Sequence, residues 1–313
     1  MHFVVTGGAG FIGSHLVEEL LSEGHSITVV DNLTTGNRLN LPEHPCLELL
    51  EKDILTCQPK DFVSPIDGIA HLAAISSVRE SWLRPLETHH NNLSTTMAVI
   101  QLCEALNIPR FVFASSAAVY GNVSKPLITE ELDSYPTSPY GLHKLASEQY
   151  GNLFTKKLNF SFVALRLFNA FGPRQKPDSH YASVISLFAT AMQQNAPITI
   201  YGDGSQTRDF VYVKDAAIAL TNALTIPLSP GTSLTCNVGT GKSTSMIKLI
   251  DILKTYFPQW KAKINYASPR LGEIQDSQAD ISRATSTLGF RPQWSIESGC
   301  HLLIESMHKK RMT

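Results

Sequence analysis

Short apolar runs alternate with longer stretches of helical periodicity through the first half of the chain. The runs rich in β-branched or aromatic residues predict strands at residues 2–5, 26–30, 47–50, 69–74, 110–114 and 161–167. Apolar residues at helical spacing predict helices between them, among others at 16–21, 93–106 and 139–158. Because parallel strands need long crossover connections, this alternation predicts an α/β fold with a doubly wound parallel sheet.

The pattern changes after Asn169. Prolines and glycines become denser and the predicted elements become shorter. We interpret residues 1–169 as a domain built on the sheet, and residues 170–313 as a smaller α/β region. The apolar stretch within residues 205–225 is expected to return to the sheet domain.

Three glycines follow the first predicted strand. Gly7, Gly10 and Gly13 form G-x-x-G-x-x-G, and a helical pattern follows at once. Such glycines allow a tight turn, a close approach of the backbone to a pyrophosphate, and close packing of helix against strand. The first helical turn, with Phe11 and Ile12, presents N–H groups and the positive end of the helix dipole to phosphates. This predicts a Rossmann-like dinucleotide site.

Asp31 stands at the end of the second predicted strand. A carboxylate about 20 residues beyond the glycines is placed to accept hydrogen bonds from the adenosine ribose hydroxyls. It would repel a 2′-phosphate, and although Asn32 follows, the first basic residue is the more distant Arg38. The sequence therefore predicts NAD rather than NADP.

Small or polar residues also follow the next two predicted strands. Asp53 comes after the third, where it is placed to meet the adenine amino group, with Ile54 beside it. The fourth ends in Ala73 and Ala74, whose small side chains leave room for the cofactor, with Leu72 before them. Because ligands of such sheets bind at the carboxyl ends of the strands, these residues are expected at one site.

A helix predicted to begin at Ser138-Pro139 carries Tyr140 and Lys144 one turn apart on one face. A phenol has an ordinary pKa of about 10, so it acts as a base near neutrality only when its phenolate is stabilised. The Lys144 ammonium and the helix dipole both favour the phenolate. Ser116, after the fifth strand, is placed to hold the reacting oxygen. Together they suit removal of a carbinol proton during hydride transfer, whereas Tyr-x-x-x-Lys alone is also typical of a solvated helix face.

Several stretches together resemble the extended short-chain dehydrogenases/reductases, and among them the nucleotide-sugar 4-epimerases of the UDP-glucose and UDP-N-acetylglucosamine group. These stretches are TGGAGFIGSHL, VVDNLTTG, HLAA, FASSAAVYG, SPYGLHKLASE, LRLFNAFGPRQ, IYGDGSQTRDFVYVKD, NVGTG and PRLGEIQDSQADISRA. The resemblance covers almost the whole chain. It implies an NAD-binding domain at 1–169, a mainly UDP-sugar-binding region at 170–313, and Ser116, Tyr140 and Lys144 as the catalytic triad. It also adds Asn91 and Phe168 to the cofactor site.

The same resemblance assigns residues to the UDP-sugar. Arg208 and Arg270 are expected on the diphosphate, because a guanidinium holds two phosphate oxygens at once; surface ion pairing is the plainer alternative. Ser76 stands where glucose-type epimerases often carry Lys, so neighbouring Ser77 is assigned either to sugar hydroxyls or to cofactor phosphate. The remaining contacts are expected from Asn169 on the diphosphate, Glu273 on the ribose, and Ala182, Val184, Ile185 and Tyr201 around the uridine.

Ser277 is expected to decide which sugar fits. In the family, the residue four positions beyond the ribose-binding acid faces the C2 substituent of the sugar, and here that position is Ser277. A tyrosine there restricts the site to glucose and galactose, whereas a small residue admits an N-acetyl group. A polar loop lined by Ser277 is the plainer interpretation.

The resemblance implies C4 epimerisation of a UDP-hexose through a transient 4-keto sugar, with UDP-GlcNAc/UDP-GalNAc favoured and UDP-Glc/UDP-Gal also accepted. UDP-glucuronate 4-epimerase, a 4,6-dehydratase and a decarboxylase are the alternatives. A dehydratase needs an acid/base pair after the strand-five hydroxyl residue, where this chain has Ala117 and Ala118. A non-catalytic NAD-sensing protein is less favoured, since such proteins typically lose the Tyr or the Lys.

The charge and the residue composition exclude several other classes of protein. A net charge of −1 gives no basic footprint for nucleic acid or membrane surfaces, and no apolar run reaches the length of a membrane span. No signal peptide is expected. The five cysteines are scattered, and no His-x-x-x-His occurs, so we expect reduced thiols, a cytoplasmic protein and no metal site. By analogy with the family, the helices at 93–106 and 139–158 are expected to pair in a homodimer.

Overall fold

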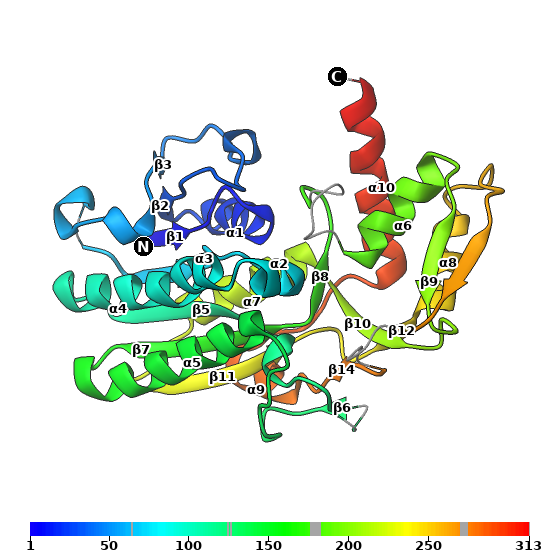
Figure 1. Cartoon of the computed structure of the whole chain (residues 1–313). Coiled ribbons are helices and arrows are strands. Elements are labelled where there is room, and N and C mark those ends of the chain that lie inside the picture. Colours follow the sequence, from blue (N-terminus) through cyan, green and yellow to red (C-terminus); the bar gives the residue numbers. More distant parts are fainter. Residues whose placement is uncertain (64, 124, 126, 176–182, 270–274, 313) are drawn as a thin grey trace.

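A seven-stranded parallel sheet forms the centre of the larger part of the molecule (Figure 1). The computed structural model describes residues 1–312 except 64, 124, 126, 176–182 and 270–274, and only the backbone of 310–312. From edge to edge the strands are β11 (Ser233–Val238), β7 (Ser161–Leu167), β5 (Arg110–Ser116), β4 (Gly68–His71), β1 (His2–Thr6), β2 (Ser26–Val30) and β3 (Leu47–Leu50). The strand order reverses between β1 and β4, so a ligand crevice is expected outside their carboxyl ends.

The sheet confirms the predicted Rossmann-like α/β class, and each of the six predicted strands is present. The strand predicted at 69–74 ends earlier, at His71, so Leu72 to Ala74 form the loop after β4. Strand β11 was not predicted, because its sequence SLTCNV is broken by polar residues. It nevertheless pairs with β7 along its full length.

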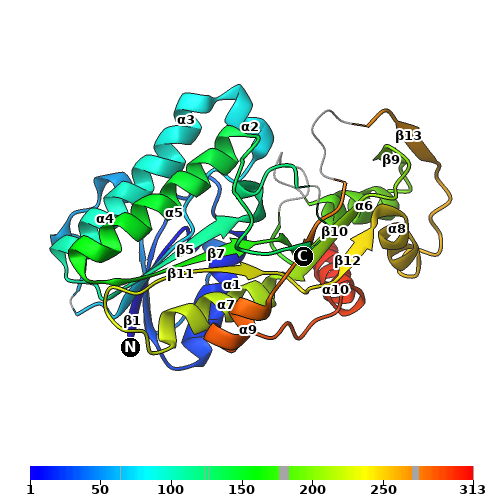
Figure 2. The same cartoon turned by 90° about the horizontal axis from the view of Figure 1, so that it is seen from below.

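Helices cover both faces of the sheet (Figure 2). One face carries α1 (Phe11–Ser22), α7 (Val213–Thr225) and α9 (Ser282–Leu288). The other carries α4 (Thr95–Ala105) and α5 (Pro139–Leu158). Apolar residues of both faces, such as Leu16 and Leu220 on one and Val99 and Phe162 on the other, are fully or almost fully buried. Packing of the helices on both faces holds the strands in place, and the predicted site residues follow the carboxyl ends of these strands.

Two helices differ in how well the sequence predicted them. The helix expected at 139–158 is α5 itself, with Ser138 capping its start and Asn159 in the left-handed region at its end. Of the helix expected at 93–106, only the part that forms α4 (Thr95–Ala105) is α-helical. It is preceded by α2 (Val78–Leu83), α3 (Pro85–His89) and a π-helical turn, η4 (His90–Ser94). Short 3-10 helices occur at η1 (Arg38–Asn40), η2 (Ile54–Thr56), η3 (Pro59–Asp61) and η5 (Ala117–Val119).

The second region lies beyond the carboxyl end of the sheet and has its own apolar core (Figure 1). Its sheets are small: β12-β10-β8, β13 with β9, and β14 with β6. The strands are β6 (Leu127–Ile128), β8 (Asn169–Phe171), β9 (Ile198–Tyr201), β10 (Thr207–Tyr212), β12 (Ser243–Ser245), β13 (Ile264–Ala267) and β14 (Gln278–Ala279). The helices are α6 (Val184–Gln193), α8 (Met246–Lys254) and α10 (Ile296–Met312). Within the described residues, no helix is long and apolar enough to cross a membrane.

Candidate active site

The glycine turn lies between β1 and α1. Gly7 has φ +70°, and a Cβ there would lie 2.7 Å from the backbone nitrogen of Ala73. A Cβ on Gly13 would lie 2.2 Å from the carbonyl oxygen of Gly7. A Cβ on Gly10 would meet only that same oxygen, at 3.1 Å, so its outer side is open. Gly7 and Gly13 therefore serve the packing of the turn, and Gly10 leaves space for a ligand.

The start of α1 is suited to a pyrophosphate. No side chain of the described residues caps this helix, and its first turn holds no acidic residue. The first N–H groups of a helix have no partner within the helix, and they carry the positive end of its dipole. Half-exposed Phe11 and Ile12 stand in this first turn. The residues present therefore fit the dinucleotide phosphates.

Asp31 lies against the glycine turn. One carboxylate oxygen accepts a hydrogen bond from the Ala9 N–H and the other from the Leu33 N–H, both at 2.9 Å. Burial raises the pKa of Asp31, and these two hydrogen bonds oppose the rise. The side chain thus holds the turn in place as well as standing at the position expected for a ribose contact.

The other predicted cofactor residues gather at the same sheet edge. The Asn32 amide donates to the Asp53 carboxylate at 3.2 Å, which joins the ends of β2 and β3. Ile54 beside them is buried. The backbone N–H groups of Leu72 and Ala73 both donate to Thr6, so the loop containing Ala74 passes beside Gly7.

Asn91 and Phe168 complete the predicted cofactor set. Asn91 is half-buried in the π-helical turn and donates to the carbonyl oxygen of Glu87, and Phe168 is buried after β7. Neighbouring Asn92 was not predicted. Its side chain accepts a hydrogen bond from the Ile75 N–H and donates to the Ile75 carbonyl, so it fixes the loop that follows Ala74.

Tyr140 and Lys144 lie in the first turns of α5, beside the carboxyl end of β5. Ser138 accepts a hydrogen bond from the Gly141 N–H at 3.1 Å, which fixes the helix start as predicted. The side chains of Tyr140 and Lys144 are both buried. The Lys144 ammonium donates to the carbonyl oxygen of Ala114 at 2.7 Å and lies 4.6 Å from the centre of the Phe113 ring.

The electrostatics differ from the sequence expectation in one respect. Burial raises the pKa of Tyr140, and the Ser116 side chain opposes this rise. Burial lowers the pKa of Lys144 to about 8, and the charge of Glu148 opposes this fall. A lowering of the Tyr140 pKa by Lys144 was expected; instead the lysine donates to the β5 backbone, and burial dominates the environment of the phenol.

The structure corrects the prediction for Ile185, shows packing or capping contacts for Val184 and Ser77, and leaves three other predicted substrate residues outside the described residues. Ile185 is fully buried in the core of the second region, so it does not line a pocket, and half-buried Val184 packs against that core. Ser77 caps α2 by accepting a hydrogen bond from the Glu80 N–H. Ala182, Arg270 and Glu273 lie outside the described residues.

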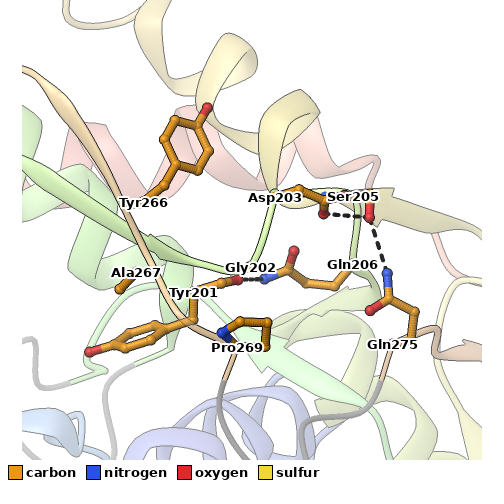
Figure 3. A pocket seen from close by; sticks show the side chains of 9 residues that line it. All are labelled: Tyr201, Gly202, Asp203, Ser205, Gln206, Tyr266, Ala267, Pro269 and Gln275. Atoms are coloured by element: carbon orange, nitrogen blue, oxygen red, sulfur yellow. Dashed lines mark hydrogen bonds between the residues drawn. The ribbon is translucent and has the colours of Figure 1, made fainter.

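A cavity of about 720 Å³ contains the predicted uridine residue Tyr201 (Figure 3). It lies at the carboxyl ends of the paired strands β9 and β13, next to the turn that connects β9 to Gln206. The Gln206 amide donates to the carbonyl oxygen of Tyr201 at 2.7 Å. The cavity is lined by Tyr201, Gly202, Asp203, Ser205, Gln206, Tyr266, Ala267, Pro269 and Gln275. Its size suits part of a nucleotide.

Asn169 and Arg208 stand on neighbouring strands, β8 and β10. The Asn169 amide donates to the carbonyl oxygen of Asp209 at 3.0 Å. The Arg208 guanidinium donates to the carbonyl oxygen of Thr207 at 2.7 Å. The structure thus brings these two predicted diphosphate residues to one place.

Asp209 was missed, although it directly follows Arg208 in the motif TRDF. Its fully buried carboxylate accepts hydrogen bonds from the backbone N–H groups of Thr240, Gly241 and Ala279. These bonds hold the turn before β12 and the segment after Ser277. Ser277 itself is buried rather than in an open, wet loop.

The family model for the NAD dependent epimerase/dehydratase family matches residues 3–239. A putative UDP-glucose 4-epimerase from Methanocaldococcus jannaschii is 36% identical over 313 residues, covering 99% of both chains. A UDP-N-acetylglucosamine 4-epimerase from Methanobrevibacter ruminantium, solved with UDP-N-acetylmuramic acid, is 34% identical with a TM-score of 0.92, over 99% of this chain and 98% of that one. A UDP-glucuronic acid 4-epimerase from Bacillus cereus is 31% identical with a TM-score of 0.90, over 99% and 100%.

The chain therefore belongs to the NAD-dependent epimerase/dehydratase family. The family resemblance, the isomerase class and NAD as the cofactor are confirmed.

Proposed function

We propose that the protein interconverts the C4 epimers of a UDP-hexose by transient oxidation at C4. The arrangement that supports this is the buried pair Tyr140 and Lys144 at the end of β5, next to Ser116. The glycine turn follows β1 at the same edge of the sheet. Bound NAD supplies the redox chemistry, the acceptance and return of one hydride. Relatives that cover 99% of this chain are named as UDP-glucose or UDP-N-acetylglucosamine 4-epimerases.

The side chains divide the proton transfer among them. The Tyr140 oxygen takes the proton of the 4-hydroxyl, and the Ser116 hydroxyl holds the reacting oxygen. The Lys144 charge favours the phenolate that this step requires. Once the 4-keto sugar has turned in the site and C4 has regained its hydride on the other face, Tyr140 returns the proton to the C4 oxygen, which completes the opposite epimer. No additional acid/base pair follows Ser116, which disfavours dehydration.

Anchoring of UDP allows the sugar to turn without leaving. Tyr201 lines a nucleotide-sized cavity, and Asn169 and Arg208 stand together on β8 and β10. We propose that these groups bind the UDP, with Arg270 and Glu273 adding to them. Binding energy from this remote, unreactive part of the substrate then holds the reacting sugar at the catalytic residues.

We propose UDP-GlcNAc and UDP-GalNAc as the preferred pair, with UDP-Glc and UDP-Gal also accepted. The small side chain at Ser277 supports this preference, and the Methanobrevibacter relative is named for UDP-N-acetylglucosamine. UDP-glucuronate is the second candidate, because the Bacillus cereus relative is named for it.

Incubation with a panel of UDP-sugars, without added NAD, tests the proposal. Chromatographic separation should show C4 epimers of the N-acetyl pair formed at the highest rate, and of the glucose pair more slowly. Exclusive turnover of UDP-glucuronate would replace the substrate assignment. Conversion of no UDP-sugar, even after NAD is added, would contradict the proposed function.

We further propose a homodimer formed through α5 and the helices packed against it. Leu142 and Leu153 on α5 are 55% and 64% exposed, and Leu86 on α3 is 70% exposed. Helices α2, α3 and α4 all contact α5, so these exposed leucines belong to one group of packed helices. Monomeric proteins rarely leave such a patch open to water, and a second copy of the chain is the occupant that we assign to it.

The five free cysteines support a cytoplasmic location.

A further inference from the structure

A buried carboxylate lies one helical turn beyond Lys144. Glu148 occupies the next position in the series Tyr140, Lys144, Glu148, which places all three on one face of α5. The residue is 6% exposed. A carboxylate at this depth is costly unless it is paired and hydrogen-bonded, so its partners show what holds it there.

Arg166 on β7 and Ser115 on β5 fix the Glu148 carboxylate. Two Arg166 nitrogens donate to the two carboxylate oxygens, at 3.0 and 2.7 Å, in the fork geometry of a bidentate ion pair. The Ser115 hydroxyl donates to one of the same oxygens. Arg166 is itself 7% exposed, and its guanidinium lies 4.7 Å from the centre of the Tyr120 ring. The carboxylate is therefore held from two strands.

Glu148 and Lys144 contact consecutive residues of β5. The Lys144 ammonium donates to the carbonyl oxygen of Ala114, and Glu148 accepts from the hydroxyl of the next residue, Ser115. The two charged ends are thus bound to the same strand at adjacent positions. Any shift of Glu148 relative to β5 also changes the surroundings of Lys144.

The other groups around Lys144 do not supply a negative charge. The facing residue of β4, His71, is fully buried and neutral at physiological pH, because burial and the Lys144 charge lower its pKa to about 3. On α5, burial raises the pKa of Tyr140, so in the protein without substrate this phenol carries no charge that would offset Lys144. Arg166 on β7 is positive, and Ser115 and Ser116 on β5 are uncharged. Among the described residues facing Lys144, the opposing charge comes from Glu148.

We propose that Glu148, held by Ser115 and Arg166, is a positioning residue that keeps Lys144 charged and in register with Tyr140. The inference rests on the proposed function, in which the Lys144 charge assists Tyr140. It adds that the charge of Lys144 is maintained from the interior of the protein by a group that touches neither substrate nor cofactor.

The test measures the pKa of Lys144 directly and through catalysis. Protein labelled with ¹³C at lysine Cε is titrated by NMR, and the Lys144 signal is assigned by its loss in Lys144→Met. Glu148→Gln removes the charge but leaves Arg166 unpaired, which can prevent folding. The double variant Glu148→Gln/Arg166→Met removes both charges and avoids that problem. In Glu148→Gln, where it folds, we expect the pKa of Lys144, and the lower-pH limb of kcat/KM, to fall by about one pH unit. In the double variant, which also loses the positive charge of Arg166, both should fall by a smaller amount.

Asp215→Asn is the matched control. Asp215 is a fully buried carboxylate on α7 that accepts hydrogen bonds from the backbone N–H groups of Gln293 and Trp294. Its loss should lower the unfolding temperature without moving the Lys144 titration. An unchanged Lys144 pKa in the double variant, or the same shift in Asp215→Asn, would overturn the inference. Wild-type activity in Lys144→Met would instead contradict the proposed function, while the NMR titration would still report on Glu148.

Discussion

The ammonium nitrogen of Lys144 lies 5.9 Å from the centre of the Tyr140 ring and donates instead to the carbonyl oxygen of Ala114. In the proposed mechanism the lysine therefore acts on the phenol through its charge rather than through a direct hydrogen bond. Tyr140 is buried, and its pKa is raised, so the phenolate depends on a nearby positive charge. The reaction should be sensitive to whether Lys144 is protonated.

We predict that epimerisation rises as the pH approaches about 8 and declines only at higher pH, where Tyr140 titrates. Burial lowers the pKa of Lys144 to about 8 and raises the pKa of Tyr140 above its ordinary value. The reactive pair, a charged Lys144 beside an ionised Tyr140, holds one proton fewer than the fully protonated pair, so it is most populated between the two pKa values. Rates measured from about pH 6 to about pH 10 in constant ionic strength test this. A profile that stays flat across the range would show that this charged pair is not required.

Tyr140→Phe should reduce epimerisation by at least about 100-fold, since removal of a positioned acid/base group has effects of this size. The ring and its packing remain, so the unfolding temperature and the NAD content should change little. Product formation, circular dichroism and released NAD are measured on the same preparation. Ser115→Ala, a change at a hydroxyl directed to Glu148 rather than to the reacting oxygen, is the comparison variant and should retain more activity. Near-normal turnover of Tyr140→Phe would assign the base elsewhere.

Gly13→Ala should weaken both NAD retention and folding. The new Cβ would lie 2.2 Å from the carbonyl oxygen of Gly7, so the glycine turn must shift. Overpacking of this kind costs about 1–3 kcal/mol in unfolding free energy. Gly289→Ala is the control, because its Cβ would meet nothing within 4 Å and only the backbone at φ +65° is strained. Dinucleotide released by denaturation should be depleted in Gly13→Ala and unchanged in Gly289→Ala; equal retention in both would contradict a cofactor role for the turn.

The elements that could be predicted are those whose signals are local. The helix α5 was predicted from its Ser-Pro start and its length, and the glycine turn from its spacing. Ile185 was wrongly expected in a pocket, because only the packing of α6 on the second core decides which of its faces is buried. Ser77 has the local pattern of a helix cap as well as of a ligand contact, and the sequence does not separate the two.

The buried polar partners depend on contacts between distant segments. Glu148 and Arg166 are 18 residues apart, and Asp209 and Ala279 are 70 apart. A partial signal existed, because Glu148 continues the helical spacing of Tyr140 and Lys144, and Arg166 interrupts an otherwise apolar strand. That signal indicates a buried charge but does not identify its partner.

Leu153→Glu should convert the proposed dimer to a monomer. Leu153 lies on the exposed surface of α5, and a carboxylate there would have to be buried without a partner in the interface. Sedimentation velocity over a range of protein concentrations should show one smaller species. Leu187→Glu on α6, which is 49% exposed and outside this surface, is the control. A wild-type protein that sediments as a monomer would contradict the proposed dimer.

Ser277→Tyr should separate the two sugar pairs. Ser277 is 5% exposed, and the segment around it is tied to β10 by Thr207 and Asp209, so an added ring cannot simply swing into solvent. If Ser277 faces the C2 substituent, the phenol fills the volume that an acetamido group needs, and a steric change of this kind is worth about 1–3 kcal/mol, or roughly 10- to 200-fold in kcat/KM. Turnover of UDP-GlcNAc and UDP-GalNAc should fall by this factor, while UDP-Glc and UDP-Gal retain most of theirs. Ser277→Ala, which keeps the site small, should leave the ratio of the two pairs unchanged. An equal loss on both pairs in Ser277→Tyr would show that this position supports the fold of the segment and does not select the sugar.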